Sequence, residues 1–439
     1  MEAHGEIPAS RFAHSSIIYG NEILVYGGVV ASDEPDRGSG LAGVEGRGGE
    51  VTNEVWRGTI EATSVQWRNV TPTTCSPHYR PPLGHCGGLH LSGHTTVLVH
   101  LGKTKKPVML VFFGHSPHYG YMHLVQEYYI DEGVWSVSAT RGWSARAGFG
   151  HSAAFDELSR KVYVHAGLVS ESEATQAPSA SLFEYEIETR IWRPLPSAPT
   201  PRYLHSAIFI SPGIMLVFGG NSHNDSAVAT VSNPVTAKCF SGAALLYDVR
   251  CQQWMPAPPG PVSARIGSAA ALLPLQSRRT AIVYAGFDGR LRSDALTFTV
   301  GDKCSSRTDE VACLNTAQYG VACVWKQDSC VAIEEIGWKD SFDSSVKACV
   351  SPPVFDDRRC AAAEYCEACA AADCAWCGAC LPSSHCMRHS HQIAVTVEEC
   401  GPSGAGGEVC GRYHSCAACH AHLHRHPHGS EELGQRACY

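Results

Sequence analysis

One pattern of polar and apolar positions recurs along the first three hundred residues. Most copies have an arginine, a His-Ser or His-Thr pair, an apolar stretch, and a second apolar stretch that ends in glycine. The copies occupy residues 11–28, 93–114, 146–167, 202–220 and, in a weaker form, 265–286. Short runs of β-branched and aromatic residues bounded by Gly, Pro and Asn are typical of strands. The pattern therefore predicts an all-β fold made of five similar units.

Each of the first four units continues to a tryptophan, and successive tryptophans are 68, 57 and 62 residues apart. They are Trp67, Trp135, Trp192 and Trp254. About four strands per unit of about 50 residues is the arrangement of a kelch blade, in which glycine ends a strand at a tight turn. Residues 1–302 are therefore predicted to form a kelch-type β-propeller, with blades near 11–72, 90–138, 146–196, 201–258 and 264–300. We expect each tryptophan to pack between neighbouring blades.

The recurring His-Ser pair has two interpretations. It could supply a base and a nucleophile, but a catalytic group is needed once and beside partners that are not repeated. A residue that returns in every unit is more typical of one that holds the units together. The chain also has no Gly-x-Ser-x-Gly motif. We therefore expect no catalytic residue and no cofactor, and we expect the repeated arginines to donate hydrogen bonds to loop carbonyls.

Irregular segments interrupt the units. The Gly-rich segment 30–50 and the shorter segments 171–180 and 222–238 are predicted to be surface loops. Propeller ligands dock on loops at one face or in the central channel, so segments 30–50, 115–125 and 221–238 are the predicted contact regions. Within them, His118, Tyr119 and His223 are the candidate ligand-binding residues.

Cysteine content differs sharply between the two parts of the chain. Of 21 cysteines, 17 fall in the 136 residues from Cys304 to the end. Such density is typical of a disulfide or metal scaffold. The segments 303–350 and 358–400 are predicted to be small cysteine-rich modules, and 409–439 an incomplete third module with a His-rich tail. The disulfide candidates are Cys75, Cys86, Cys239, Cys251, Cys304, Cys313, Cys323, Cys330, Cys349, Cys360, Cys366, Cys369, Cys374, Cys377, Cys380, Cys386, Cys400, Cys410, Cys416 and Cys419.

Zinc is the alternative to disulfides, because Cys-x-x-Cys pairs occur in the second and third modules. Zinc ribbons, however, use four ligands per ion with long spacers, whereas eight cysteines crowd into residues 360–400 with irregular gaps. Disulfides are therefore favoured, and among them a local pair between Cys239 and Cys251 is expected. The tail histidines form a second, weaker metal alternative to unpaired surface: His420, His422, His424, His426 and His428.

Other features bear on the compartment. Sequons at Asn69 and Asn224 are candidate glycosylation sites and point to the secretory route. The N-terminus has no signal-peptide pattern, and no apolar stretch is long enough to cross a membrane. An oxidised scaffold without a leader suggests an internal piece of a longer precursor. The net charge of −8 argues against nucleic-acid binding.

At this point the residues resemble a known family. Kelch units followed by cysteine-rich plexin-semaphorin-integrin modules look like the attractin family of cell-surface glycoproteins and, more loosely, the multiple-EGF-domain proteins. The similar segments are 108–121, 202–207, 215–225, 237–240, 247–254 and 323–325. Cys75 and Cys86 have no counterpart that the resemblance supplies, and residues 420–439 depart from the family pattern.

The resemblance implies a six-bladed propeller, of which five units are visible, with the first expected before Met1. It further implies a non-enzymatic recognition or adhesion module that acts in signalling or receptor modulation. Protein or glycan ligands at the cell surface are the expected partners. The membrane would be reached only through segments of a longer single-pass protein that lie outside this chain.

Two other classes of function are open from the sequence. An intracellular kelch adaptor for ubiquitination would need reduced cysteines and a BTB-type domain, and no such segment is present in the sequence. A kelch-fold oxidase with copper and a Cys–Tyr cross-link would need one non-repeated His/Tyr/Cys cluster. The histidines in phase with the units are repeated instead.

Overall fold

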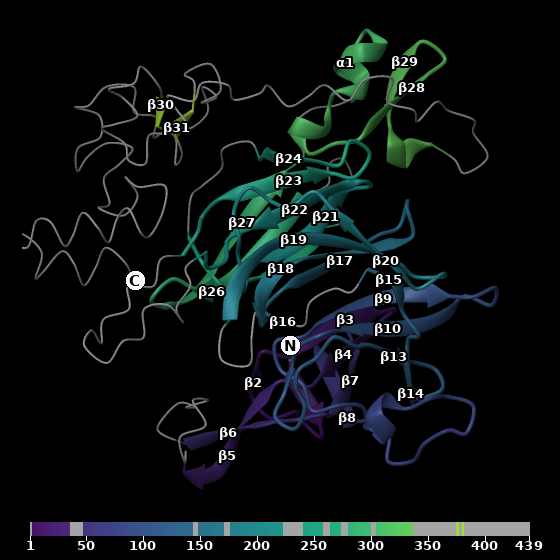
Figure 1. Cartoon of the computed structure of the whole chain (residues 1–439), viewed down its shortest axis with the longest axis vertical. Coiled ribbons are helices and arrows are strands. Elements are labelled where there is room, and N and C mark those ends of the chain that lie inside the picture. Colours follow the sequence, from purple (N-terminus) through teal and green to yellow (C-terminus); the bar gives the residue numbers. More distant parts are fainter. Residues whose placement is uncertain are drawn as a thin grey trace, which may run out of the picture. The chain divides into compact units, whose positions relative to one another are not determined.

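The computed structural model describes residues 2–35, 47–143, 148–170, 176–222, 240–257, 264–273, 280–299, 304–336, 375–376 and 380–381. The chain divides into two compact units, an N-terminal unit Met1–Ser197 and a C-terminal unit Ala198–Tyr439. Strands dominate both units (Figure 1). The all-β prediction is therefore confirmed.

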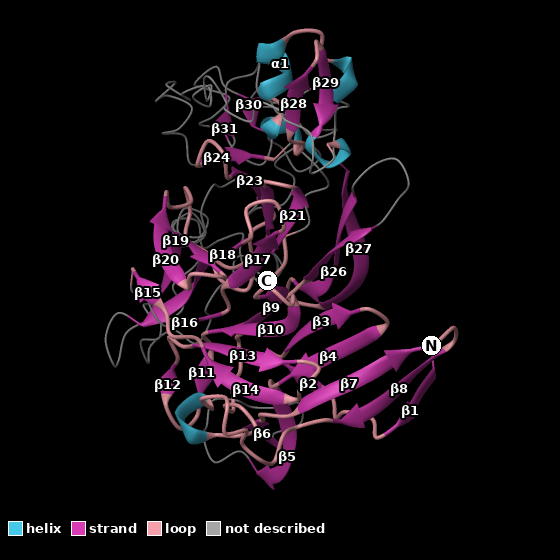
Figure 2. Cartoon of the chain, turned by 90° about the vertical axis from the view of Figure 1, so that its right-hand side faces the viewer, coloured by secondary structure: helices cyan, strands magenta, loops and turns pink. Residues whose placement is uncertain are grey.

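Three larger sheets build the N-terminal unit, and Figure 2 shows the strands of the first lying side by side. The first sheet has the order β1 (Glu2–Gly5), β8 (Ser64–Asn69), β7 (Val55–Ile60), β4 (Glu22–Tyr26), β3 (Ser15–Tyr19). The second has the order β14 (Val134–Val137), β13 (Val125–Tyr129), β10 (Lys106–Phe112), β9 (Thr95–Leu101). The third contains β15 (Arg141–Gly142), β20 (Ile191–Leu195), β19 (Gln176–Glu186), β18 (Lys161–Ser170), β17 (Ser152–Asp156) and β16 (Gly148–Phe149). Pairing is antiparallel except where β1 and β15 add in parallel to β8 and β20.

Smaller elements decorate these sheets. They are β2 (Arg11–Phe12), β5 (Val29–Pro35), β6 (Arg47–Val51), β11 (His115–Ser116), β12 (Gly120–Tyr121) and the 3₁₀ turn η2 (Pro82–Gly84). The prediction that 30–50 is only a loop is wrong, because β5 and β6 pair from Val29 to Val51. The prediction for 171–180 is wrong in part, since β19 already begins at Gln176 and pairs with the end of β18.

The middle sheet of the N-terminal unit is buried on both faces. Along β10, Met109 and Val111 belong to a core shared with the first sheet, whereas Val108, Leu110 and Phe112 belong to a core shared with the third. This alternation follows from the two-residue period of a strand. Two tryptophans behave as predicted: the ring centroid of Trp135 lies 4.7 Å from that of Tyr26, and that of Trp192 lies 5.8 Å from that of Phe112.

Two larger sheets and a cysteine-rich module make up the described part of the C-terminal unit. The fourth sheet has the order β21 (Ser206–Ser211), β22 (Ile214–Phe218), β23 (Ala244–Asp248), β24 (Gln253–Pro256). The fifth has the order β25 (Ala269–Leu273), β26 (Thr280–Phe287), β27 (Leu291–Thr299). The module contains η4 (Cys304–Ser306), α1 (Glu310–Leu314), η5 (Ala317–Tyr319), β28 (Cys323–Lys326), β29 (Ser329–Ala332) and η6 (Ile333–Glu335). Farther along, β30 (Ala375–Trp376) pairs with β31 (Cys380–Leu381).

The cysteine-rich module packs directly on the fourth sheet. Ile214 and Leu216 of β22 share a buried core with Ala322 and Val324 of the module. The backbone N–H of Ala322 donates to Ser211 Oγ at 3.2 Å. The short helix α1 starts at a cap in which the Asp309 carboxylate accepts from the Ala312 N–H, as expected for an N-cap aspartate.

Candidate functional site

The repeated arginines hold the glycine turns of their own sheets. Arg11 donates to the Gly27 carbonyl at 3.1 Å, Arg202 to that of Gly219 at 3.1 Å, and Arg265 to that of Ala285 at 3.0 Å. The expected contact between arginine and loop carbonyl is therefore present in three sheets. Gly27 and Gly219 directly follow β4 and β22, so these two contacts fix the ends of the strands, whereas Ala285 lies within β26 at a shift of register.

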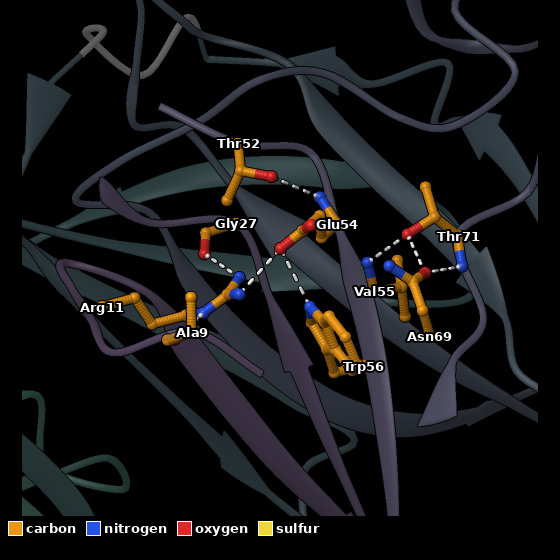
Figure 3. A network of polar contacts seen from close by, with 9 residues as sticks. All are labelled: Ala9, Arg11, Gly27, Thr52, Glu54, Val55, Trp56, Asn69 and Thr71. Atoms are coloured by element: carbon orange, nitrogen blue, oxygen red, sulfur yellow. Dashed lines mark hydrogen bonds and ion pairs between the residues drawn. The ribbon is translucent and has the colours of Figure 1, made fainter. Parts of the chain in front are cut away.

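In the first sheet an acid completes this arrangement (Figure 3). Arg11 Nη2 lies 2.7 Å from Glu54 Oε2, and Trp56 Nε1 donates to the same oxygen at 2.9 Å. Burial alone would raise the pKa of Glu54, but the hydrogen bonds from Trp56 and Arg11 outweigh it and lower the pKa. In the fifth sheet the ion pair between Arg265 and Asp294, 2.9 Å apart, has the same role.

The repeated His-Ser positions mark where neighbouring sheets join. In every unit the residue that precedes the repeated His (Ser in the fifth unit) has a positive φ. These residues are Ala13, Gly93, Gly150, Leu204 and Gly267. These residues bond to one another through the backbone, since the Gly93 N–H donates to Ala13 O, Gly150 N–H to Gly93 O, and Gly267 N–H to Leu204 O, each at 2.9 Å. Side chains add to the joins, because His151 Nε2 lies 2.9 Å from Thr95 Oγ1. The pattern thus encodes contacts between sheets.

Burial keeps His94 and His151 neutral, whereas His14 is exposed in the first repeat. Burial lowers the pKa of His94 to about 3 and that of His151 to about 4, and the pKa of His14 is also lowered. Side chains of His94 and His151 are only 3% and 5% exposed. A base that solvent and substrate do not reach is poorly suited to proton transfer. The geometry therefore favours the structural interpretation of the His-Ser pairs.

The predicted ligand residues His118 and Tyr119 lie at the tip of the β11–β12 hairpin. Tyr119 is 48% exposed, and its hydroxyl is hydrogen-bonded to His85 Nε2 at 2.8 Å. The ring of His118 lies 5.8 Å from that of His90, and at the base of the hairpin the rings of His115 and Tyr121 are 5.0 Å apart. We call this group the hairpin surface: His85, His90, His115, His118, Tyr119 and Tyr121. Burial lowers the pKa of His115.

A disulfide-closed loop supports the hairpin surface from the side. Cys75 and Cys86 are bonded, and the loop between them carries η2 and an exposed Leu83. The carbonyl of Arg80 in this loop accepts from the Val137 N–H of β14 at 2.9 Å, which anchors it to the second sheet. His85 and His90 were not among the residues predicted from the sequence. The pair Cys75 and Cys86 could have indicated this region in the sequence, because a disulfide between them holds the intervening segment in place.

Three disulfides lie within the described residues. They join Cys75 to Cys86, Cys304 to Cys323, and Cys313 to Cys330. Cys251 is also disulfide-bonded, whereas Cys239 lies outside the described residues. Cys304, Cys323 and Cys330 have sulfur atoms within 4.8 Å of one another, but these atoms are already in disulfides and do not offer thiolates to zinc.

The remaining candidates divide between described and undescribed positions. Asn69 is exposed, and its Oδ1 accepts from both the N–H and the hydroxyl of Thr71, at 2.9 and 2.7 Å (Figure 3). Cys380 lies in β31. Outside the described residues lie Asn224, His223, the histidines 420–428, and Cys349, Cys360, Cys366, Cys369, Cys374, Cys377, Cys386, Cys400, Cys410, Cys416 and Cys419. Within the described part of the chain, no helix has the length and hydrophobicity of a membrane span.

Comparison with known proteins agrees with this architecture. The putative protein tag-53 of Caenorhabditis elegans is 26% identical over 445 residues, which cover 97% of this chain and 30% of that protein. Multiple epidermal growth factor-like domains protein 8 of Homo sapiens is 24% identical over 357 residues, which cover 74% of this chain and 11% of that protein. Its counterpart in Mus musculus is 28% identical over 296 residues. The chain thus spans less than a third of the length of these relatives.

A family model covers most of the chain. It matches residues 1–296, which carry the five larger sheets apart from the end of β27, and its description is Attractin/LZTR1 beta-propeller. The disulfide-bonded module that follows is consistent with a plexin-semaphorin-integrin-like module. The resemblance found in the sequence is confirmed: the chain belongs to the attractin/LZTR1 β-propeller family.

Proposed function

We propose that this chain is a non-enzymatic extracellular recognition module of an attractin-like cell-surface glycoprotein, acting in signalling or receptor modulation. Its partners are protein or glycan ligands, which it binds through propeller loops. The hairpin surface carries the proposal, because it presents the exposed His118 and Tyr119 among half-buried aromatic and imidazole side chains, held by a sheet and a disulfide-closed loop. Aromatic residues on a rigid frame are typical binding anchors.

Two observations support an extracellular rather than an intracellular role. Disulfides persist in oxidising compartments and are rare in the reducing cytosol. The bonds Cys75–Cys86, Cys304–Cys323 and Cys313–Cys330 close loops in both units. An intracellular ubiquitination adaptor would need these thiols reduced, so the disulfides favour the cell surface. The names of two relatives, which refer to epidermal growth factor-like domains, agree with this choice.

The use of the repeated histidines supports a non-enzymatic role. His94 and His151 are buried between sheets and kept neutral, and the serines beside such positions also join sheets. Ser206 Oγ, for example, lies 2.9 Å from Ser268 Oγ in the next sheet. An oxidase would require one copper-binding cluster outside the repeat. The exposed histidine of the hairpin surface, His118, contacts the ligand in this proposal instead.

Cell-surface binding tests the ligand role. The tagged, secreted chain is applied to intact cells, and bound protein is measured by flow cytometry for the wild type and for His118→Ala and Tyr119→Ala. We expect both variants to bind at least about tenfold more weakly, as for loss of a contact residue. Tyr284→Ala is the matched control, because Tyr284 is 51% exposed in the C-terminal unit. Equal binding by all four proteins would contradict the proposal.

Glycosylation tests the compartment independently of any ligand. The Asn69 side chain is exposed and its sequon partner Thr71 is hydrogen-bonded to it. The chain secreted from animal cells is expected to lose mass on treatment with an amidase that removes N-glycans. Asn69→Gln should lack one glycan, whereas Thr71→Ser keeps the sequon and should retain it. No difference between Asn69→Gln and the wild type would mean that Asn69 is not modified.

A further inference from the structure

A second surface feature of the N-terminal unit shares no residue with the hairpin surface. A pocket of about 340 Å³ opens where the second and third sheets meet the disulfide-closed loop. Its polar and aromatic lining residues include Tyr79, Thr104, Lys106, Tyr129, Glu188 and Arg190. This volume is at the lower end of the range of small-molecule sites, about 300–1,000 Å³. The pocket is thus large enough for a small ligand or one unit of a polymer.

Its polar side chains are held in place before any ligand arrives. Lys106 Nζ lies 2.7 Å from Glu132 Oε1 and donates to the Tyr79 hydroxyl at 3.3 Å. Arg190 is paired with the buried Glu127, with 2.9 Å between Nη2 and Oε1. Fixed side chains lose little conformational entropy on binding, which favours affinity.

Glu188 is held from two directions. Its carboxylate accepts from the backbone N–H of Gly102 at 3.3 Å and lies 3.4 Å from Arg160 Nη2. The side chain remains 46% exposed, and each carboxylate oxygen has a second lone pair with which it can accept from a ligand. The pocket therefore offers a fixed acceptor in Glu188, fixed donors in Lys106 and Arg190, and a hydroxyl in Thr104 that can do both.

The charges of the pocket cancel. The lining holds two cations, Lys106 and Arg190, and one anion, Glu188, and their ion-pair partners Glu132, Glu127 and Arg160 beside it bring the sum to zero. An anionic ligand would meet Glu188, and a cationic ligand would meet Lys106 and Arg190. A neutral ligand that both donates and accepts hydrogen bonds fits this set best, and these are the properties of a polyhydroxyl compound.

Two tyrosines supply an aromatic wall. The rings of Tyr79 and Tyr129 have centroids 4.6 Å apart and are tilted by 49°. Aromatic rings present an apolar body with a polar tip, which suits the C–H faces and hydroxyls of a sugar ring. Tyr79 belongs to the loop that Cys75 and Cys86 close, so this disulfide places one of the two rings.

We propose that this pocket binds an uncharged hexose unit of a glycan. The Tyr79 and Tyr129 rings contact the sugar, Glu188 accepts from its hydroxyls, and Lys106 and Arg190 donate to its oxygens. The disulfide-closed loop has a function in this arrangement, because it completes the wall of the pocket. Sugar binding in this pocket rests on the proposed function only in that glycans are present outside the cell. The pocket and the hairpin surface are different surfaces.

A glycan array tests the ligand class. The secreted full chain is applied to immobilised neutral oligosaccharides of glucose, galactose and mannose, and to sialylated and sulfated glycans. We expect binding to a subset of the neutral group. Glu188→Gln should weaken it by about tenfold, since a charge-assisted hydrogen bond is replaced by a weaker neutral one. Tyr79→Ala should do the same, with Tyr79→Phe retaining the ring and most of the binding.

Matched variants separate this site from the hairpin surface. Thr104→Ala removes a hydroxyl from the pocket at an exposed turn. This variant tests the pocket even if Tyr79→Ala lowers stability. Tyr119→Ala should bind neutral glycans as the wild type does, even if it no longer binds cells. Three outcomes would overturn the proposal: no neutral glycan bound at millimolar sugar, binding restricted to acidic glycans, or binding that Glu188→Gln, Thr104→Ala and Tyr79→Ala all leave unchanged.

Discussion

Gly114 lies against the backbone of His94, so closely that a Cβ on the glycine would come within 2.8 Å of the His94 Cβ. The same 2.8 Å contact relates Gly167 to His151 and Gly220 to His205. Two features of the sequence pattern, the glycine and the histidine, are thus the two halves of one contact. The pattern recurs because four of the sheets make this contact with a histidine, and in the fifth Ser268 takes the place of the histidine beside Gly286.

The first prediction follows from this contact. Gly220 has φ +95°, and an added Cβ would also meet the Tyr203 carbonyl at 3.0 Å. Gly220→Ala should lower the free energy of unfolding by about 2 kcal/mol or more, because strained backbone and steric overlap add. Urea unfolding measures this. Gly213→Ala is the control, since its φ of +78° is also positive but no atom lies within 4 Å of the added Cβ. Equal losses in the two variants would show that the contact contributes nothing.

The buried histidines predict a dependence of stability on pH. The folded-state pKa values of His94 and His151 are lowered to about 3 and about 4, whereas in the unfolded chain histidine titrates near 6.5. Between about pH 6.5 and about pH 4 the unfolded chain therefore binds more protons, and stability falls as the pH falls. Urea unfolding at about pH 7.5 and about pH 5 should show the loss, while most carboxylates stay ionised.

A variant pair assigns that effect. His151→Gln removes one titrating group, so the difference in unfolding free energy between the two pH values should shrink. His4→Gln replaces an exposed histidine and should leave the difference as in the wild type. If His151→Gln showed the wild-type pH dependence, the loss on acidification would have to come from other groups.

Arg265 carries the third prediction. Its side chain is fully buried and bonds to the Ala285 carbonyl at 3.0 Å and to both oxygens of Asp294, at 3.2 and 2.9 Å. Arg265→Lys keeps the charge but loses the forked geometry, and should cost about 1.5–3 kcal/mol. Urea unfolding measures this cost, and Arg290→Lys, at an exposed turn, should show no change within error in the same measurement. A fully stable Arg265→Lys protein would mean that the charge alone suffices.

The disulfide pairing of the first cysteine-rich module is the fourth prediction. The bonds cross in sequence, Cys304 to Cys323 and Cys313 to Cys330. Mass spectrometry of a non-reduced digest should recover these two pairs and a third peptide pair that joins Cys75 to Cys86. Because the sulfur atoms of Cys304, Cys323 and Cys330 are close together, a peptide joining Cys304 to Cys330 is the geometric alternative. Its recovery as the main product would contradict the structure.

Much of the fold could be predicted because the repeat is local. Strands, glycine turns and the Trp135 and Trp192 contacts follow from residue types at fixed spacing, so five copies reinforce one another. Segments outside the repeat have no such reinforcement. Residues 30–50 look like a loop from their glycines, yet β5 and β6 pair there because the ends of the segment, Val29 and Val51, are buried.

The candidate site was harder to predict than the fold. Tyr119 is found by its position in an irregular hairpin, but its hydrogen-bond partner His85 is 34 residues away in sequence. The same holds for Tyr79 and Tyr129, which meet only after the Cys75–Cys86 loop folds onto β13 and β14. Contacts that depend on how a loop packs on a sheet leave no periodic signal. They must be read from the structure.

The contact between the cysteine-rich module and the fourth sheet bears on how the protein unfolds. Cysteine content changes abruptly near residue 300, yet Ile210 and Ile214 of the fourth sheet are covered by residues of the module. Cooperative units follow buried contacts and not composition. A chain cut at residue 302 would expose this apolar surface and aggregate, whereas one that continues through Ile336 keeps it covered. The fourth sheet and the first module should therefore melt together, as one foldon.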